Sequence, residues 1–123
     1  MATVEDLVWI KKLWYKNDHV LGVPFDAYLD IKKYTILVIP EIAFVRFAKK
    51  KTGENYVYDI AVDKDARKSG VGRKLMDMIE KPIMLKTDVG NVESNLFYKN
   101  LGFIALAHVK SRKGRPMVVY AKF

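Results

Sequence analysis

The stretch ARKSGVGRKL, residues 66–75, places two glycines around one valine among four cations. It follows an apolar run and precedes a segment with helical spacing. Glycine has no Cβ atom, so an anion can approach its backbone closely, and the N–H groups and dipole of a helix's first turn favour negative charge. The stretch therefore predicts a phosphate-binding corner between a strand and a helix.

Two common phosphate-binding loops do not match this corner. A P-loop requires Gly-Lys followed by Ser or Thr, whereas Arg73 and Lys74 follow Gly72. A Rossmann fingerprint requires a third glycine, where this chain has Leu75, and a tighter turn after the strand. The pattern that remains is Arg-x-x-Gly-x-Gly, formed by Arg67, Gly70 and Gly72.

Composition narrows the class of protein. With 123 residues, half of them hydrophobic and 29% charged, the chain reads as one globular domain spanning residues 1–123. It has no cysteine, and its two histidines, His19 and His108, lie far apart, so we expect no disulfide and no metal site. No stretch has the roughly 20 apolar residues of a membrane span, and we expect a cytoplasmic protein. The net charge of +8 favours anionic partners.

Hydrophobic spacing changes period along the chain. It predicts two helices, three strands, a helix, a strand, a helix and a closing hairpin of two strands, which is an α/β fold with a mixed sheet. The expected helices cover residues 4–15, the segment after Pro24, 70–80 and 91–100. The expected strands cover 34–40, 41–50, 56–62 and 83–87, with the hairpin around the turn SRKGR.

A second motif, NVESNLFYKNLGF (residues 91–103), joins an asparagine, a tyrosine seven residues later, and Leu-Gly-Phe at the end of a helix. Together with the Arg-x-x-Gly-x-Gly corner, it resembles the GCN5-related N-acetyltransferases (GNAT), which bind acetyl-CoA. The resemblance extends from Tyr56 to Phe103. It implies a single-domain GNAT-like α/β fold, with a central mixed, mostly antiparallel sheet, splayed central strands and flanking helices. The family's first strand would be missing or very short.

The resemblance also implies which residues bind the coenzyme. The backbone of the strand before the glycine corner would bind pantetheine, and the corner itself would bind the pyrophosphate. Asn91 matches a family asparagine that contacts the coenzyme, although Asn is also a common helix N-cap. The implied coenzyme-binding residues are Ile60, Ala61, Val62, Arg67, Lys68, Ser69, Gly70, Val71, Gly72, Arg73 and Asn91.

Tyr98 matches the family tyrosine that protonates the departing thiolate of coenzyme A. A phenol, with a pKa of about 10 in model compounds, can pass a proton to a thiolate whose conjugate acid has a pKa of about 8.5, if the two groups are close. The alternative is that Tyr98 is a core residue beside Leu96 and Phe97. The resemblance favours the general-acid role for Tyr98 over the core position.

The acceptor side is less defined. Direct attack needs a neutral amine, and a lysine-type amine is neutral only about one time in 2,500 at pH 7, a penalty of roughly 4.6 kcal/mol. Relatives that acetylate protein N-termini carry a glutamate where this chain has Lys86. Asp59 and Glu41 are candidates for binding or deprotonating the amine, with a surface charge as the alternative for both. The acceptor amine stays unidentified.

A different function remains open beside the acetyltransferase. Residues 108–117, HVKSRKGRPM, place four cations at a hairpin tip that could lie on phosphates. A nucleic-acid-binding protein on an inactive scaffold, or acetylation of an amine associated with nucleic acid, would use this segment. The sequence favours the acetyltransferase, with acetyl-CoA and an amine as partners, and a homodimer is compatible with the family.

Overall fold

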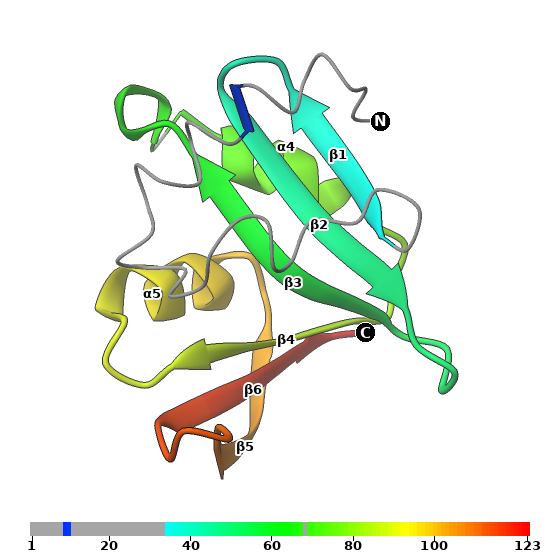
Figure 1. Ribbon diagram of the computed structural model, residues 1–123, viewed down its shortest axis with the longest axis vertical. Helices are drawn as coiled ribbons and strands as arrows, with labels where there is room; N and C mark the ends of the chain where they lie inside the picture. The colour runs from blue at the N-terminus through cyan, green and yellow to red at the C-terminus, as the bar shows by residue number, and fades with distance from the viewer. Residues whose placement is uncertain (1–8, 11–33, 68) are drawn as a thin grey trace. The chain divides into compact units, whose positions relative to one another are not determined.

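A computed structural model describes residues 9–10, 34–67 and 69–123 (Figure 1). Trp9 and Ile10 are helical, in agreement with the helix expected over 4–15, and Ile10 is fully buried. The remainder of that helix, the helix expected after Pro24, His19 and Lys68 lie outside the described residues. None of the helices in the described ranges is long and apolar enough to cross a membrane.

The chain divides into two compact units. The first unit comprises Met1–Ala48 and Val57–Ile79, and the second comprises Lys49–Tyr56 and Glu80–Phe123. The two long strands that continue from one unit into the other are β2 (Ala43–Lys49) and β3 (Asn55–Val62). Each unit contains buried apolar residues of its own.

The first unit is built on a pair of antiparallel strands. β1 (Thr35–Ile39) runs against β2, with Thr35 opposite Phe47 and Ile39 opposite Ala43. Four of the five residues of β1 are β-branched, as is common in strands. Helix α4 (Val71–Asp77) lies against β1, and the short 3₁₀ turn η1 (Lys64–Ala66) leads toward it from the end of β3. Ile36, Phe44, Val45 and Leu75 form the fully buried centre of this unit.

Helix α4 is shorter than the segment expected from the sequence. The spacing of apolar residues predicts a helix over 70–80, whereas α4 ends at Asp77. Beyond it, the N–H groups of Met78 and Ile79 donate to the carbonyls of Leu75 and Met76, three residues back. Such bonds are the tighter 3₁₀ type that often closes a helix. The apolar stripe thus continues to the buried Ile79 in a tightened turn.

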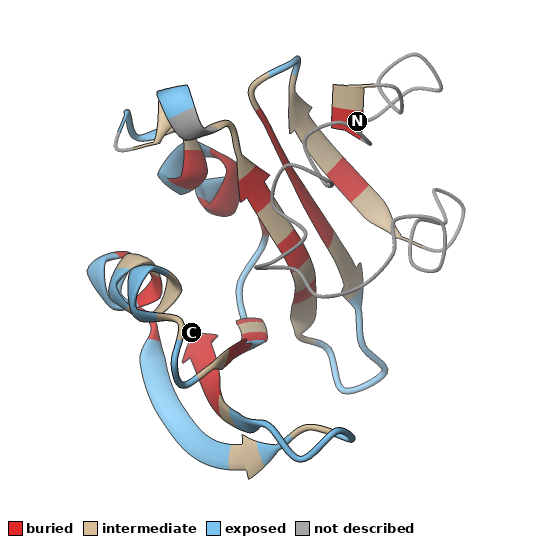
Figure 2. Ribbon diagram, turned by 60° about the vertical axis from the view of Figure 1, so that its left-hand side comes forward, coloured by how far each residue is buried: buried red, intermediate tan, exposed pale blue. Residues whose placement is uncertain are grey.

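The second unit is a three-stranded sheet with one helix. β4 (Ile83–Asp88), β5 (Ile104–Lys110) and β6 (Pro116–Lys122) are joined through β6, which is antiparallel to both neighbours. Helix α5 (Val92–Asn100) connects β4 to β5. The core includes Leu85, Tyr98, Leu101, Phe103 and Tyr120, whereas six of the seven residues of β5 are exposed (Figure 2).

Strand order and direction confirm the expected fold class. The six strands form one sheet in the order β1-β2-β3-β4-β6-β5. β3 and β4 are parallel and pair at only two positions, Asn55 with Ile83 and Tyr56 with Met84, while the pairs β1–β2, β4–β6 and β5–β6 are antiparallel. A two-residue ladder is the short pairing expected of splayed central strands. The sheet is therefore mixed and mostly antiparallel, and the family's first strand would fall outside the described residues.

Candidate functional site

The glycine corner lies in the first unit, where η1 leads to α4. Gly70 is the N-cap of α4, and its φ of 85° lies in the left-handed region that glycine adopts without steric cost. A Cβ atom at position 70 would have no neighbouring atom within 4 Å among the described residues. The N–H groups of Gly70, Val71 and Gly72 make no hydrogen bond within the described part of the chain. The corner therefore presents open space and free donors, which fit an anion.

Hydrogen bonds within the preceding loop hold its shape. The N–H groups of Asp65 and Ala66 donate to the side chain and the carbonyl of Asp63, at 3.0 and 2.9 Å. Arg67 Nε donates to the carbonyl of Val62 at 3.3 Å, which folds the loop back on the end of β3. The Ser69 hydroxyl donates to the carbonyl of Ala66. Of the cations expected here, Arg73 is exposed, whereas Arg67 is half-buried by its contact with the strand.

A buried ion pair lies just before the strand end that the resemblance assigns to pantetheine. Arg46 on β2 is fully buried, and its Nη2 atom lies 2.5 Å from Oδ2 of Asp59 on β3. The Arg46 guanidinium also lies over two aromatic rings, 4.5 Å from the centroid of Tyr34 and 5.3 Å from that of Tyr58. The two rings meet edge to face at 5.1 Å. Arg46 is thus held by one carboxylate and two π faces.

Asp59 is therefore not a surface charge, and that alternative is wrong for this residue, which is only 6% exposed. Burial raises the pKa of Asp59 to about 6, because removing the carboxylate from water outweighs the attraction of Arg46. Glu41, the second acceptor-side candidate, is exposed in the turn between β1 and β2, where its φ is 63°. For Glu41 the surface position is confirmed.

The other two candidates lie on α5 in the second unit. Asn91 is the N-cap of this helix, and its Oδ1 atom accepts from the N–H of Ser94 at 3.1 Å. The N-cap interpretation is therefore confirmed. The Asn91 Nδ2 group has no hydrogen-bond partner among the described residues, so the cap leaves it available.

Tyr98 lies two turns further along α5, in a cluster of aromatic rings. Its centroid lies 5.7 Å from that of Phe103 and 5.8 Å from that of Tyr120, and the Tyr98 residue is 7% exposed. The packing expected of a core tyrosine is therefore present. Its role as a general acid stays a prediction.

The sequence analysis does not single out two further residues, one in each unit. The first is Arg46, for which the signal is a single cation inside the otherwise apolar segment AFVRFA. Asn95 is the second: its Nδ2 donates to the carbonyls of Asp88 and Asn91 at 3.1 and 2.7 Å, and its Oδ1 accepts from the Tyr120 hydroxyl at 2.5 Å. A polar residue four positions after an N-cap was the available signal.

The predicted residues thus fall into two groups. The first unit holds Glu41, Asp59, Ile60, Ala61, Val62, Arg67, Ser69, Gly70, Val71, Gly72 and Arg73, and the second holds Asn91 and Tyr98. Lys68 lies outside the described residues. Among the described residues there is no group of His, Cys, Asp and Glu arranged to hold a metal ion.

Solved structures of similar fold are numerous. Ard1 from Thermoplasma volcanium has a TM-score of 0.79 and 18% identity, over 98% of this chain and 93% of that one. The ribosomal-protein-S18-alanine N-acetyltransferase from Escherichia coli has a TM-score of 0.70 and 17% identity, over 98% and 88%. NAA60 from Arabidopsis thaliana in complex with acetyl-CoA has a TM-score of 0.57 and 13% identity, over 67% and 65%. Structural similarity at such low sequence identity establishes the fold alone.

The sequence itself matches a family. No curated protein sequence matches the chain with significance. The profile described as "Acetyltransferase (GNAT) domain" matches residues 32–105, which is more than half of the 123 residues and includes the glycine corner, Asn91 and Tyr98. The chain therefore belongs to the GNAT acetyltransferase family.

Proposed function

We propose that this protein is an acetyl-CoA-dependent N-acetyltransferase that transfers the acetyl group to an amine by direct attack. The observation that carries the proposal is the open corner at Gly70, whose donors have no partner within the described chain, in a sequence that matches the GNAT family. A polyphosphate coenzyme satisfies such donors, and two solved structures of similar fold are complexes with acetyl-CoA.

Each group of residues has a separate task in this proposal. The N–H groups of residues 70–72 bind the pyrophosphate, and Lys68 and Arg73 add positive charge beside it. The backbone of Ile60–Val62 binds the pantetheine arm, and a backbone N–H there stabilises the charge that develops on the thioester oxygen. Asn91 contributes its free Nδ2 group to the coenzyme.

The chemical step needs one proton donor and one proton acceptor. The amine nitrogen bonds to the acetyl carbon, the carbon–sulfur bond breaks, and Tyr98 gives its hydroxyl proton to the departing thiolate. The amine loses its own proton before or during attack. We assign the attraction of a cationic amine to the exposed Glu41, and the proton to Asp59, whose pKa of about 6 suits a base that works near neutral pH.

Coenzyme binding is tested first, without knowledge of the acceptor. Acetyl-CoA should raise the melting temperature, and Gly72→Glu should abolish the shift by placing a carboxylate among the phosphate donors. Because Gly72 is buried and its replacement could impair folding, Arg73→Glu on the exposed side of the same turn serves as a second variant. Met78→Glu, at the exposed C-cap of α4, adds one negative charge as Gly72→Glu does and is the control for that variant. An unchanged melting temperature of the wild type at millimolar acetyl-CoA would contradict the proposal.

Catalysis is tested by thiol release from acetyl-CoA with a panel of amines. Once an acceptor is found, Tyr98→Phe should lower kcat by about 10²–10⁴-fold while the affinity for acetyl-CoA changes little. Tyr120→Phe is the matched control, because it removes another phenol hydroxyl from the same aromatic cluster. If both variants lose coenzyme affinity and kcat to the same degree, Tyr98 is a packing residue.

A further inference from the structure

The positive charge of the chain is concentrated in one unit. The second unit contains eleven Lys and Arg against four Asp and Glu, a net charge of +7, whereas the first contains eleven against ten, a net charge of +1. From Ser94 to Phe123 the sequence has six cations and no carboxylate. Repulsion among like charges opposes folding, so a cluster of this kind is costly unless a partner balances it.

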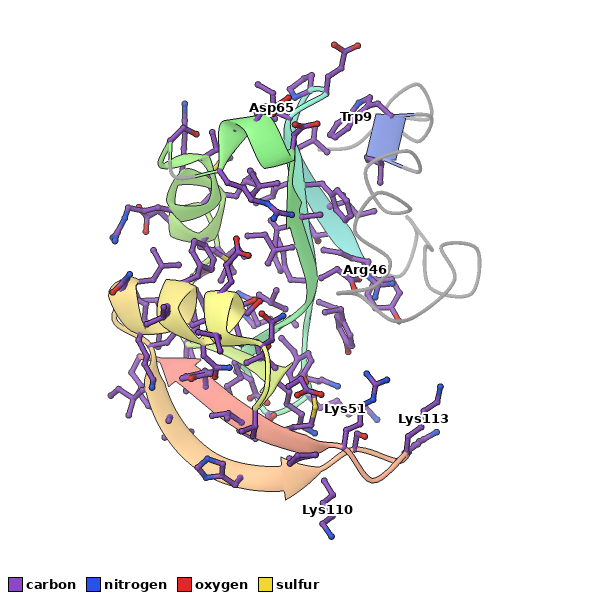
Figure 3. The ribbon with its side chains drawn as sticks, turned by 90° about the vertical axis from the view of Figure 1, so that its left-hand side faces the viewer. Trp9, Arg46, Lys51, Asp65, Lys110 and Lys113 are labelled. Carbon is purple, nitrogen blue, oxygen red and sulfur yellow. The ribbon has the colours of Figure 1, made fainter. Side chains whose placement is uncertain are left out.

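Four of these cations lie at the tip of the β5–β6 hairpin: Lys110, Arg112, Lys113 and Arg115. All four are exposed, and none forms an ion pair with a residue in the described ranges. Figure 3 shows Lys110 and Lys113 directed away from the strands, from either side of the tip. The coenzyme proposal uses none of them.

The turn that carries these cations is held by hydrogen bonds. The Ser111 N–H donates to the Arg115 carbonyl at 2.9 Å, and the Arg115 N–H donates back to the Ser111 hydroxyl at 3.1 Å. The Gly114 N–H donates to the Ser111 carbonyl at 2.9 Å, and the φ of Gly114 is 79°, a conformation that favours glycine. A defined turn presents its charges in a fixed arrangement, which reduces the entropy lost on binding.

The side chains at the tip indicate the chemistry of the partner. Arginine binds phosphate in a bidentate manner, and the tip has two arginines and two lysines without a carboxylate among them. Residues 110–115 contain no aromatic side chain on which a base could stack and no large apolar side chain that could enter a membrane or a protein hot spot. This combination fits a phosphodiester backbone better than it fits a lipid surface or a folded protein.

We infer that the hairpin tip, residues 110–115, is a binding site for the phosphate backbone of nucleic acid, used in addition to the acetyltransferase site and without base specificity. Binding through three to four phosphates predicts a slope of about −3 when the logarithm of the binding constant is plotted against that of salt concentration. Affinity should then fall by roughly 60-fold between 50 and 200 mM salt.

The test uses the full chain and a fluorescently labelled DNA duplex of mixed sequence, titrated at several salt concentrations. Replacement of Arg112, Lys113 and Arg115 by alanine should weaken binding at 50 mM salt by more than tenfold and remove most of the salt dependence. Alanine at Lys49, Lys50 and Lys51 is the matched control, because it removes three cations near the other hairpin turn of the same unit. The control should lower affinity by less than threefold.

Three results would overturn the inference. Equal losses in the two triple variants would mean that net charge, and not this tip, attracts the duplex. A flat salt dependence of the wild type would exclude phosphate contacts, and tighter binding to polyglutamate or to phosphatidylserine vesicles than to the duplex would indicate another partner. The melting-temperature shift with acetyl-CoA should be the same in the tip variant and the wild type, so failure of this inference is distinguishable from failure of the proposed function.

Discussion

Arg46 in the first unit and Arg112 in the second are the same side chain in opposite surroundings. Arg46 is fully buried, paired with Asp59 and covered by two tyrosine rings. Arg112 is exposed at a hairpin tip and has no ion pair within the described chain. Formal charge alone therefore says little about the role of a cation, because burial decides whether it stabilises the fold or remains available to a partner.

The largest expected effect is on stability in the first unit. Arg46→Met should lower the free energy of unfolding by about 3–5 kcal/mol, since it leaves the Asp59 carboxylate buried without its counter-charge. Arg112→Met is the matched control and should change stability by less than about 0.5 kcal/mol. Urea denaturation measures both.

The double variant Arg46→Met/Asp59→Leu tests whether the unpaired buried charge causes this loss of stability. Replacing both partners removes the buried charge altogether, so stability should return close to that of the wild type. If Arg46→Met alone costs less than about 1 kcal/mol, Asp59 takes up a proton or water in the variant, and the loss assigned to an unpaired buried charge is wrong.

The free energy of unfolding should also depend on pH, and this effect is smaller. The pKa of Asp59 is about 6 in the folded protein and close to 3.8 in the unfolded chain, so the folded state binds the extra proton. The stability that this group contributes is therefore present at pH 4 and falls as the pH rises to 6, by on the order of 2–3 kcal/mol. Asp59→Asn should remove that part of the slope.

The measurement is urea denaturation of the wild type and Asp59→Asn at pH 4, 5, 6 and 7. The wild type should lose stability relative to the variant as the pH rises. A difference that changes in the opposite direction would mean that attraction by Arg46 outweighs burial, and that the pKa of Asp59 lies below its ordinary value.

The smallest expected effect separates two roles of Asn91 in the second unit. Asn91→Ala should cost about 1 kcal/mol, because the N–H of Ser94 loses its cap. Asn91→Asp keeps an oxygen acceptor of equal capping strength but lacks the Nδ2 donor. Its stability should therefore match the wild type, while its affinity for acetyl-CoA should fall in a calorimetric titration if Nδ2 contacts the coenzyme. An unchanged affinity would leave Asn91 as a cap alone.

Most of the fold was predictable because its elements alternate clearly in period. The strands over 34–40, 41–50, 56–62 and 83–87 appear within one or two residues of their expected bounds, and the closing hairpin has its turn at SRKGR as expected, although β5 begins only at Ile104. The end of α4 could not be predicted, because a 3₁₀ turn keeps the apolar spacing of a helix while changing its hydrogen bonds.

The candidate site was predictable where a motif fixes local geometry, as at the Gly70 corner and the Asn91 cap. Arg46 could not be assigned, since a strand pattern gives no information on which cross-strand residue meets which. Asp59 was expected on β3, but its pairing with the buried Arg46 of β2 joins two residues that are distant in sequence. Pairing of side chains is a tertiary property, and one-dimensional spacing does not encode it.

Among the described strands, β5 is the last in the sheet order, and it carries the exposed aliphatic side chains of Ile104 and Leu106. A strand of another molecule can pair with the outer edge of such a strand. The register shift between Ala105 and Ala107 interrupts the edge, and the cations where the strand ends repel a second copy. Concentrated salt screens that repulsion, so the colloidal stability of this protein should depend on ionic strength more than its folding does.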